Sequence, residues 1–127
     1  MADASDPDHG LLVQTLEQWP GELVVSAFTA VEADHLVLTR LGIDAELALI
    51  DDLAITYTVQ ALDPAGIKRA RDLCARYRDL QLGLADASIV VLAAQWSTRS
   101  VATFDQRHFR AVVPLQGGAF RLLPADA

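Results

Sequence analysis

Residues 82–105, LGLADASIVVLAAQWSTRSVATFD, carry the pattern that decides the fold class. Gly83 interrupts the preceding sequence, and residues 85–96 are almost all apolar, which is typical of a helix that is buried on every side. The run SVATF at residues 100–104 follows closely and predicts a strand. A buried helix followed directly by a strand is the repeating unit of an α/β fold.

The rest of the chain continues this alternation of helices and strands. Asp6-Pro7 and Asp63-Pro64 each place an N-cap residue before a proline, which opens a helix, and Gly42 is suited to end one. This order predicts an α/β fold with a mainly parallel central sheet and helices on both faces, within a single domain of residues 1–127. The expected helices cover about residues 6–19, 29–41, 44–53, 63–79 and 85–96, and the expected strands cover residues 22–26, 55–59, 100–104 and 119–123.

Charge and composition narrow the class of protein. The net charge is −7, with twelve acidic residues and one basic residue in residues 1–63, against five acidic and nine basic residues in residues 64–127. Bulk acidity argues against indiscriminate nucleic-acid binding, while the basic second half leaves room for one cationic face. The longest apolar run, residues 89–94, is too short to cross a bilayer, and MADASDPDH lacks the apolar segment of a signal peptide. Because Cys74 is the only cysteine, we expect a reducing, cytoplasmic location without membrane association.

Three acidic residues occupy the strand ends and helix starts where α/β folds collect ligands. Asp105 directly follows the strand 100–104, Asp86 lies at the start of the buried helix, and Glu32 lies in the first turn of the helix expected from residue 29. Oxygen ligands without His or Cys at metal-binding spacing suit Mg²⁺ or Mn²⁺ better than zinc. A cation held by such a cluster can deliver a water to a phosphodiester while neutralising the phosphate. Arg107 and Arg110 flank Asp105 and are candidate contacts to the phosphates of such a substrate.

Each acidic residue also has a purely structural interpretation. Asp86 can act as a helix cap, Asp105 can be an ordinary turn residue, and Glu32 can belong to a solvated stripe. His108 can serve as a general acid, although packing or a surface role is the more common use of such a residue. Spacing and periodicity leave both interpretations open.

Residues 82–114, LGLADASIVVLAAQWSTRSVATFDQRHFRAVVP, resemble the C-terminal half of PIN-domain ribonucleases, specifically the VapC-type toxins. Those proteins read leucine-x-aspartate-alanine, then an apolar helix, then a strand ending in threonine-x-aspartate with a phenylalanine soon after. Upstream, SAFTAVEADHLVLTRLG at residues 26–42 resembles the family's helix that carries a glutamate. The resemblance covers about residues 6–114, and its matched positions are Glu32, Leu84, Asp86, Ala87, Thr103, Asp105 and Phe109.

The resemblance implies a fold, an activity and a partner. It implies a PIN-like three-layer fold and a Mg²⁺-dependent endoribonuclease, with Mn²⁺ as a possible substitute, whose cation is held by four acidic residues. Three of those four are Glu32, Asp86 and Asp105, and Thr103 would hydrogen-bond a site carboxylate. It further implies a cytoplasmic toxin of a type II toxin–antitoxin pair that cuts RNA and is inhibited by a cognate antitoxin.

The chain departs from the family pattern at its start, where the family has a short apolar strand ending in the fourth aspartate. Nothing apolar precedes Asp3, and DPDH corresponds to the loop and first helix after that strand, so we expect Asp3 to be a solvated terminal residue. A sheet without that strand leaves backbone groups unpaired. Residues upstream of Met1, or pairing with a second copy in a homodimer, would satisfy them. A non-catalytic PIN-like remnant or binding module is the alternative hypothesis.

Overall fold

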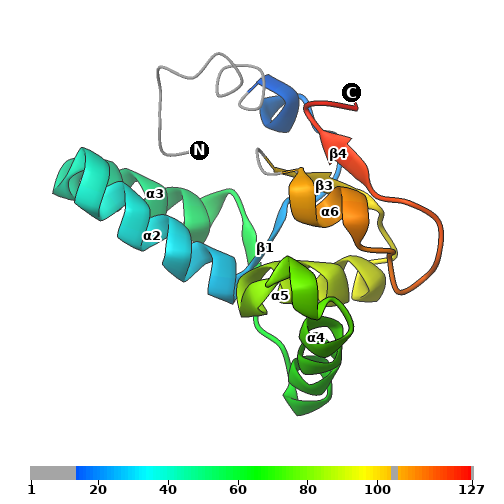
Figure 1. Ribbon diagram of the computed structural model, residues 1–127. Coiled ribbons are helices and arrows are strands. Elements are labelled where there is room, and N and C mark those ends of the chain that lie inside the picture. Colours follow the sequence, from blue (N-terminus) through cyan, green and yellow to red (C-terminus); the bar gives the residue numbers. More distant parts are fainter. Residues whose placement is uncertain (1–13, 104–105, 127) are drawn as a thin grey trace. The chain divides into compact units, whose positions relative to one another are not determined.

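The computed structural model describes residues 14–103 and 106–126, and it divides into two compact units, Met1–Ala61 and Leu62–Ala127 (Figure 1). Each unit contains one pair of parallel strands. Parallel strands that alternate with helices confirm the α/β class predicted from the sequence. The predicted first helix is represented by residues 14–17, which are helical, and the expectation for Asp3 lies outside the described residues.

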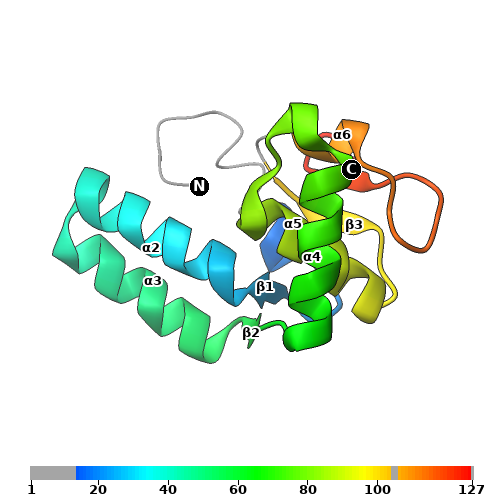
Figure 2. The same ribbon diagram turned by 60° about the horizontal axis from the view of Figure 1, so that its bottom comes forward.

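The first unit is built on a helical hairpin. Strand β1 (Val24–Ser26) leads into α2 (Ala27–Leu41), and α3 (Ile43–Ile55) returns beside it to β2 (Thr58–Gln60), as Figures 1 and 2 show. Strands β1 and β2 pair in parallel, with Val25 opposite Val59. Gly42 forms the joint of the hairpin with a φ of 92°, and its N–H donates to the carbonyls of Val37 and Leu38. A glycine is required there because side-chain-bearing residues rarely adopt this backbone conformation.

The second unit is built around one buried helix. Helix α4 (Pro64–Arg76) and the short 3₁₀ helix η1 (Arg78–Leu80) precede α5 (Gly83–Gln95), and α4 packs against α5 (Figures 1 and 2). Strand β3 (Ser100–Ala102), helix α6 (Arg107–Ala111) and strand β4 (Arg121–Leu123) follow. Strands β3 and β4 pair in parallel, with Val101 opposite Leu122.

The core of the second unit lies along α5 and β4. Val90, Val91, Leu122 and Ser88 are its largest fully buried side chains. Complete burial of a valine or leucine side chain contributes about 1.5–3 kcal/mol. The ring of Phe109 in α6 meets the ring of Phe120 edge-on, with centroids 5.8 Å apart, so the short helix is fastened to this core. The predicted burial of α5 is confirmed for the middle of the helix, whereas Leu84 and Trp96 near its ends are 45% and 40% exposed.

Several element boundaries differ from those expected. Helix α2 begins at Ala27, two residues early, because the Ser26 hydroxyl accepts a hydrogen bond from the N–H of Phe28 and caps the helix. Strand β2 begins at Thr58 because α3 continues through Ile55. Helix α6 was not predicted, since five residues are too few for a helical period to show. None of the helices among the described residues is long and apolar enough to cross a membrane.

Candidate active site around Asp86

Asp86 lies in the first turn of α5, as predicted. Its side chain is 30% exposed, while its neighbours Ala85, Ala87 and Ser88 are buried. The helix begins after Leu82 without a side-chain capping hydrogen bond, so Asp86 caps no backbone N–H, but it does lie in the first turn, where a negative charge is favourable. A partly exposed carboxylate at the start of a buried helix is a position from which an acidic residue can reach a ligand while the helix holds its backbone.

The Asp86 carboxylate is held by a histidine. Nδ1 of His108, in α6, lies 2.5 Å from Oδ2 of Asp86, 22 residues earlier in the chain. The His108 side chain is only 12% exposed, which explains why it keeps a fixed orientation. Its other ring nitrogen, Nε2, lies 3.3 Å from Nη2 of Arg107, and the same Nη2 donates to the carbonyl oxygen of Leu80 at 3.2 Å. Packing was the favoured role for His108 from sequence, and this contact with a candidate catalytic carboxylate was not foreseen.

The structure says less about the other two candidate acidic residues, Asp105 and Glu32. Asp105 lies outside the described residues. Glu32 is an exposed residue of α2 in the first unit, and it falls in the second turn because the helix begins at Ala27, so its predicted position in the first turn is wrong. Thr103 directly follows β3, and its backbone N–H donates to the carbonyl of Leu123 at 3.0 Å. The hydrogen bond expected from its side chain to a site carboxylate stays a prediction.

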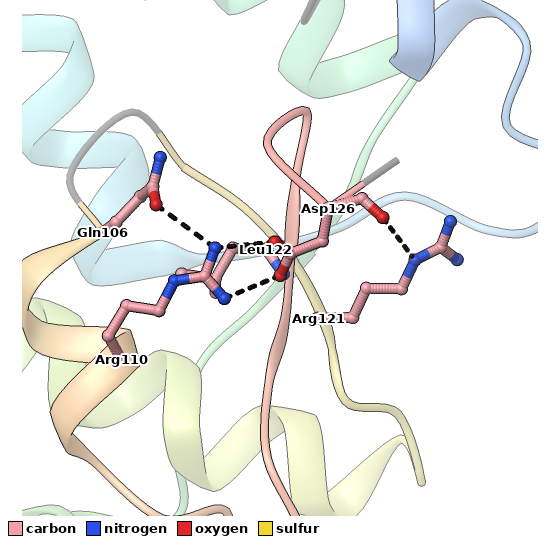
Figure 3. Close-up of polar contacts among 5 residues, drawn as sticks. All are labelled: Gln106, Arg110, Arg121, Leu122 and Asp126. Atoms are coloured by element: carbon pink, nitrogen blue, oxygen red, sulfur yellow. Dashed lines mark hydrogen bonds and ion pairs between the residues drawn. The ribbon is translucent and has the colours of Figure 1, made fainter.

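The two candidate phosphate contacts differ in their surroundings. Arg107 is an exposed residue that reaches Leu80 and His108. The Arg110 guanidinium donates to both carboxylate oxygens of Asp126, at 2.6 and 2.8 Å, as Figure 3 shows. The Arg110 guanidinium and the N–H of Leu122 lower the pKa of the Asp126 carboxyl to about 2. Arg110 is thus occupied by the C-terminal turn in this conformation.

The Asp86 carboxylate is the one candidate metal-binding group that the described residues place at this helix start. His108 occupies Oδ2 of Asp86 and leaves Oδ1 on the same partly exposed carboxylate. Among residues 14–103 and 106–126, no group of three or more His, Cys, Asp or Glu side chains is close enough to hold a metal ion. Asp86 therefore offers one carboxylate oxygen of the type that Mg²⁺ and Mn²⁺ prefer, and its role as a metal ligand stays a prediction.

Comparison with known proteins shows which family the chain resembles in sequence and structure. The PIN-domain family model matches residues 2–113, a range that includes Glu32, Asp86 and Asp105. Ribonuclease VapC26 of Mycobacterium tuberculosis (strain ATCC 25618 / H37Rv) is 40% identical over 123 residues, which cover 96% of this chain and 91% of the relative. The crystal structure of VapC20, a toxin of the same organism that cleaves the sarcin–ricin loop, superposes with a TM-score of 0.73 at 19% identity, covering 83% of this chain and 82% of that chain. The superposition confirms the predicted fold.

Proposed function

The chain belongs to the PIN-domain family and, within it, to the VapC-type ribonucleases, and from this premise we propose that it is a divalent-metal-dependent endoribonuclease toxin of a type II toxin–antitoxin pair. The observation that carries the proposal is the 40% identity to a ribonuclease over 91% of that relative's length. The fixed, partly exposed carboxylate of Asp86 supports it, because a nuclease of this kind needs an oriented acidic residue at a helix start.

Glu32, Asp86 and Asp105 are the proposed ligands of Mg²⁺, or of Mn²⁺ in its place. A divalent cation bound by these carboxylates would lower the pKa of a coordinated water and neutralise charge on the phosphodiester. Asp86 contributes an oxygen whose direction is set by His108. Arg107 and Arg110 would bind the phosphates on either side of the cut bond, because guanidinium groups donate in pairs to phosphate oxygens. Thr103 is proposed to hydrogen-bond a carboxylate of the site.

We propose that an antitoxin regulates the protein and that it binds the helical hairpin α2–α3. The hairpin exposes large apolar side chains, among them Val31 at 69%, Ile43 at 57% and Ile55 at 85%. The Asp34 carboxyl of α2 faces Glu46 of α3 closely enough to raise the pKa of the Glu46 carboxyl. An amphipathic antitoxin segment with basic residues would cover the apolar side chains and place a cation beside the two carboxyls.

Further proposals concern the oligomeric state, the cellular compartment, the substrate and the domain organisation. When no antitoxin covers them, the exposed apolar residues of α2 and α3 can pair with those of a second copy, so we propose that the free toxin forms a homodimer. The proposed compartment is the cytoplasm, where RNA and a cognate antitoxin would be present. RNA is the proposed substrate, and the whole chain is proposed to act as one PIN-like domain.

Titration with Mn²⁺ tests the metal site and the activity together. The wild-type chain should bind Mn²⁺ in calorimetry and cut RNA only when Mn²⁺ or Mg²⁺ is added. Asp86→Asn should lose both properties, because an amide is a weaker ligand than a carboxylate. Asp72→Asn is the matched control, since Asp72 is an exposed residue of α4 whose carboxylate pairs with Arg71. Undiminished binding and cleavage in Asp86→Asn would disprove the assignment, and a wild-type chain that neither binds metal nor cuts RNA would favour the non-catalytic alternative.

Binding of the protein encoded beside this one tests the antitoxin. The two purified proteins should form a complex whose affinity falls as salt is raised, because a basic segment meets the acidic hairpin. Glu46→Gln should weaken the complex, whereas Asp72→Asn on α4 should leave it unchanged. A complex that is insensitive both to salt and to Glu46→Gln would exclude this surface as the antitoxin site.

A further inference from the structure

Three groups in the second unit form a chain of contacts that ends on Asp86. Nη2 of Arg107 donates to the carbonyl of Leu80, 27 residues earlier, which anchors the guanidinium to the end of η1. The same nitrogen lies 3.3 Å from Nε2 of His108, and Nδ1 of His108 lies 2.5 Å from Asp86. This chain of contacts, called the relay below, runs from Leu80 through Arg107 and His108 to Asp86. It therefore joins η1, α6 and the first turn of α5.

The contact with Arg107 favours one of the two neutral forms of the His108 ring. A guanidinium has only N–H donors and no acceptor, so an approach of 3.3 Å to Nε2 is favourable only if Nε2 presents its lone pair. A histidine whose Nε2 is an acceptor carries its single ring proton on Nδ1. That proton then points at Oδ2 of Asp86 and completes a hydrogen bond to the carboxylate.

We propose that His108 is a positioning residue that fixes the Asp86 carboxylate for cation binding, and that Arg107 selects the tautomer which allows it to do so. The inference rests on the proposed role of Asp86 as a metal ligand. A carboxylate free to rotate must lose that freedom when it binds a cation. His108 has already restricted it, because its side chain is only 12% exposed and holds one of the two oxygens.

The expected size of the effect follows from known outer-shell partners of metal ligands, whose removal typically lowers metal affinity about 10- to 100-fold. His108→Ala should therefore weaken Mn²⁺ binding by about that factor. His108→Asn should restore most of the affinity, because its side-chain amide nitrogen occupies nearly the place of Nδ1 and can donate to Asp86. His108→Gln places its amide nitrogen nearer the position of Nε2 and should behave like the alanine variant.

Nuclear magnetic resonance of the metal-free chain supplies a readout that is independent of activity. Long-range ¹H–¹⁵N spectra at neutral pH should show a His108 ring with its proton on Nδ1 and a lone pair on Nε2. Arg107→Met removes the guanidinium and should convert His108 partly to the tautomer protonated on Nε2. His35, an exposed residue of α2, serves as the internal reference, and its signals should be the same in both proteins.

The outcomes separate this inference from the proposed function. Mn²⁺ binding that requires Asp86 but is equally tight in His108→Ala and wild type would overturn the positioning role alone. A wild-type His108 that carries its proton on Nε2, or on both nitrogens, would overturn the relay. A wild-type chain that binds no Mn²⁺ would overturn the proposed function and this inference with it. Loss of affinity in His108→Ala with recovery in His108→Asn would establish the positioning role.

Discussion

Arg110 and Asp126, 16 residues apart in the chain, form a two-point ion pair that fastens the C-terminal turn to α6 (Figure 3). Asp126 also accepts a hydrogen bond from the N–H of Leu122 at 2.7 Å, and its own carbonyl is 3.4 Å from Nε of Arg121. Two parallel N–H···O bonds are the geometry that a guanidinium uses for phosphate as well as for carboxylate. Asp126 thus occupies the donors that an RNA phosphate would need.

Removing the Asp126 carboxylate, which competes with RNA phosphates for the Arg110 guanidinium, should strengthen RNA binding. Asp126→Asn keeps an oxygen for the N–H of Leu122 but removes the charge that holds Arg110, so the guanidinium becomes available to a phosphate. In an Asp86→Asn background, in which the RNA stays intact, the affinity for single-stranded RNA should rise. The plot of log affinity against log salt should steepen by about 0.7, the value for one additional phosphate contact. Titrations at several salt concentrations measure both quantities.

The control for this experiment is a second substitution in the same protein. Arg110→Gln added to Asp126→Asn should return the affinity and the salt slope to their starting values or below. If Asp126→Asn raises the affinity equally with and without Arg110, the gain comes from the less negative net charge and Arg110 is no phosphate contact.

The carboxyl of Glu46 should make the stability of the first unit depend on pH. Its interaction with the Asp34 carboxyl raises the pKa of Glu46 above the ordinary value of 4.5. A carboxyl whose pKa is raised by folding stabilises the fold fully below 4.5 and loses that contribution as the pH rises through its folded pKa. Glu46→Gln should therefore raise the free energy of unfolding at pH 7 relative to wild type, with a smaller difference at pH 4.

Denaturant unfolding at the two pH values measures this difference. Asp44→Asn is the matched control, because Asp44 also lies in the first turn of α3, where a negative charge is favourable. It should lower the stability at pH 7. Equal gains in both variants would point to the net charge of the chain and not to the contact between Asp34 and Glu46.

Local signals in the sequence were sufficient to locate several helix ends. Asp63 caps α4 through a 2.7 Å hydrogen bond from the N–H of Gly66, and Pro64 takes the first helical position, as the Asp-Pro pair predicted. Gly42 ends α2 and Asp86 lies in the first turn of α5, also as predicted. These features depend on neighbours within four residues, and a single sequence carries that information.

Contacts between distant residues could not be predicted in the same way. Both Ile67 and Leu73 are apolar residues of α4, but Ile67 is 44% exposed, while Leu73 is buried. The face that α4 buries depends on where α5 lies against it, and its own periodicity is compatible with more than one choice. Likewise, His108 is 22 positions after Asp86, beyond strand β3, and it lies in the unpredicted α6, so its contact with Asp86 became visible only in the structure.

Gly42 offers a test of the hairpin joint. Its φ of 92° and ψ of −178° lie in a region that only glycine occupies readily, yet an added Cβ would meet no atom within 4 Å. Gly42→Ala should therefore lower the free energy of unfolding by about 1–3 kcal/mol through backbone strain alone. Gly42→Asn should give no relief, because asparagine tolerates the left-handed helical region but not this ψ. Denaturant unfolding of both variants checks this, and a stable Gly42→Asn would show that the joint relaxes to a left-handed turn.

The edge-on contact between Phe109 and Phe120 should set the position of α6 and, through it, of His108. Both rings are buried, with 3% and 5% of their surfaces exposed, and α6 has only five residues with which to hold itself in place. Phe109→Leu and Phe120→Leu should each cost up to about 1.5 kcal/mol of unfolding free energy. A double-mutant cycle should give a coupling of about 0.5–1.5 kcal/mol for the ring pair. In ¹H–¹⁵N spectra, Phe109→Leu should disturb the ring signals of His108, the next residue, more than Phe120→Leu does. A coupling near zero, with unchanged His108 signals in both variants, would mean that α6 is held by its remaining contacts, such as the ion pair of Arg110 with Asp126.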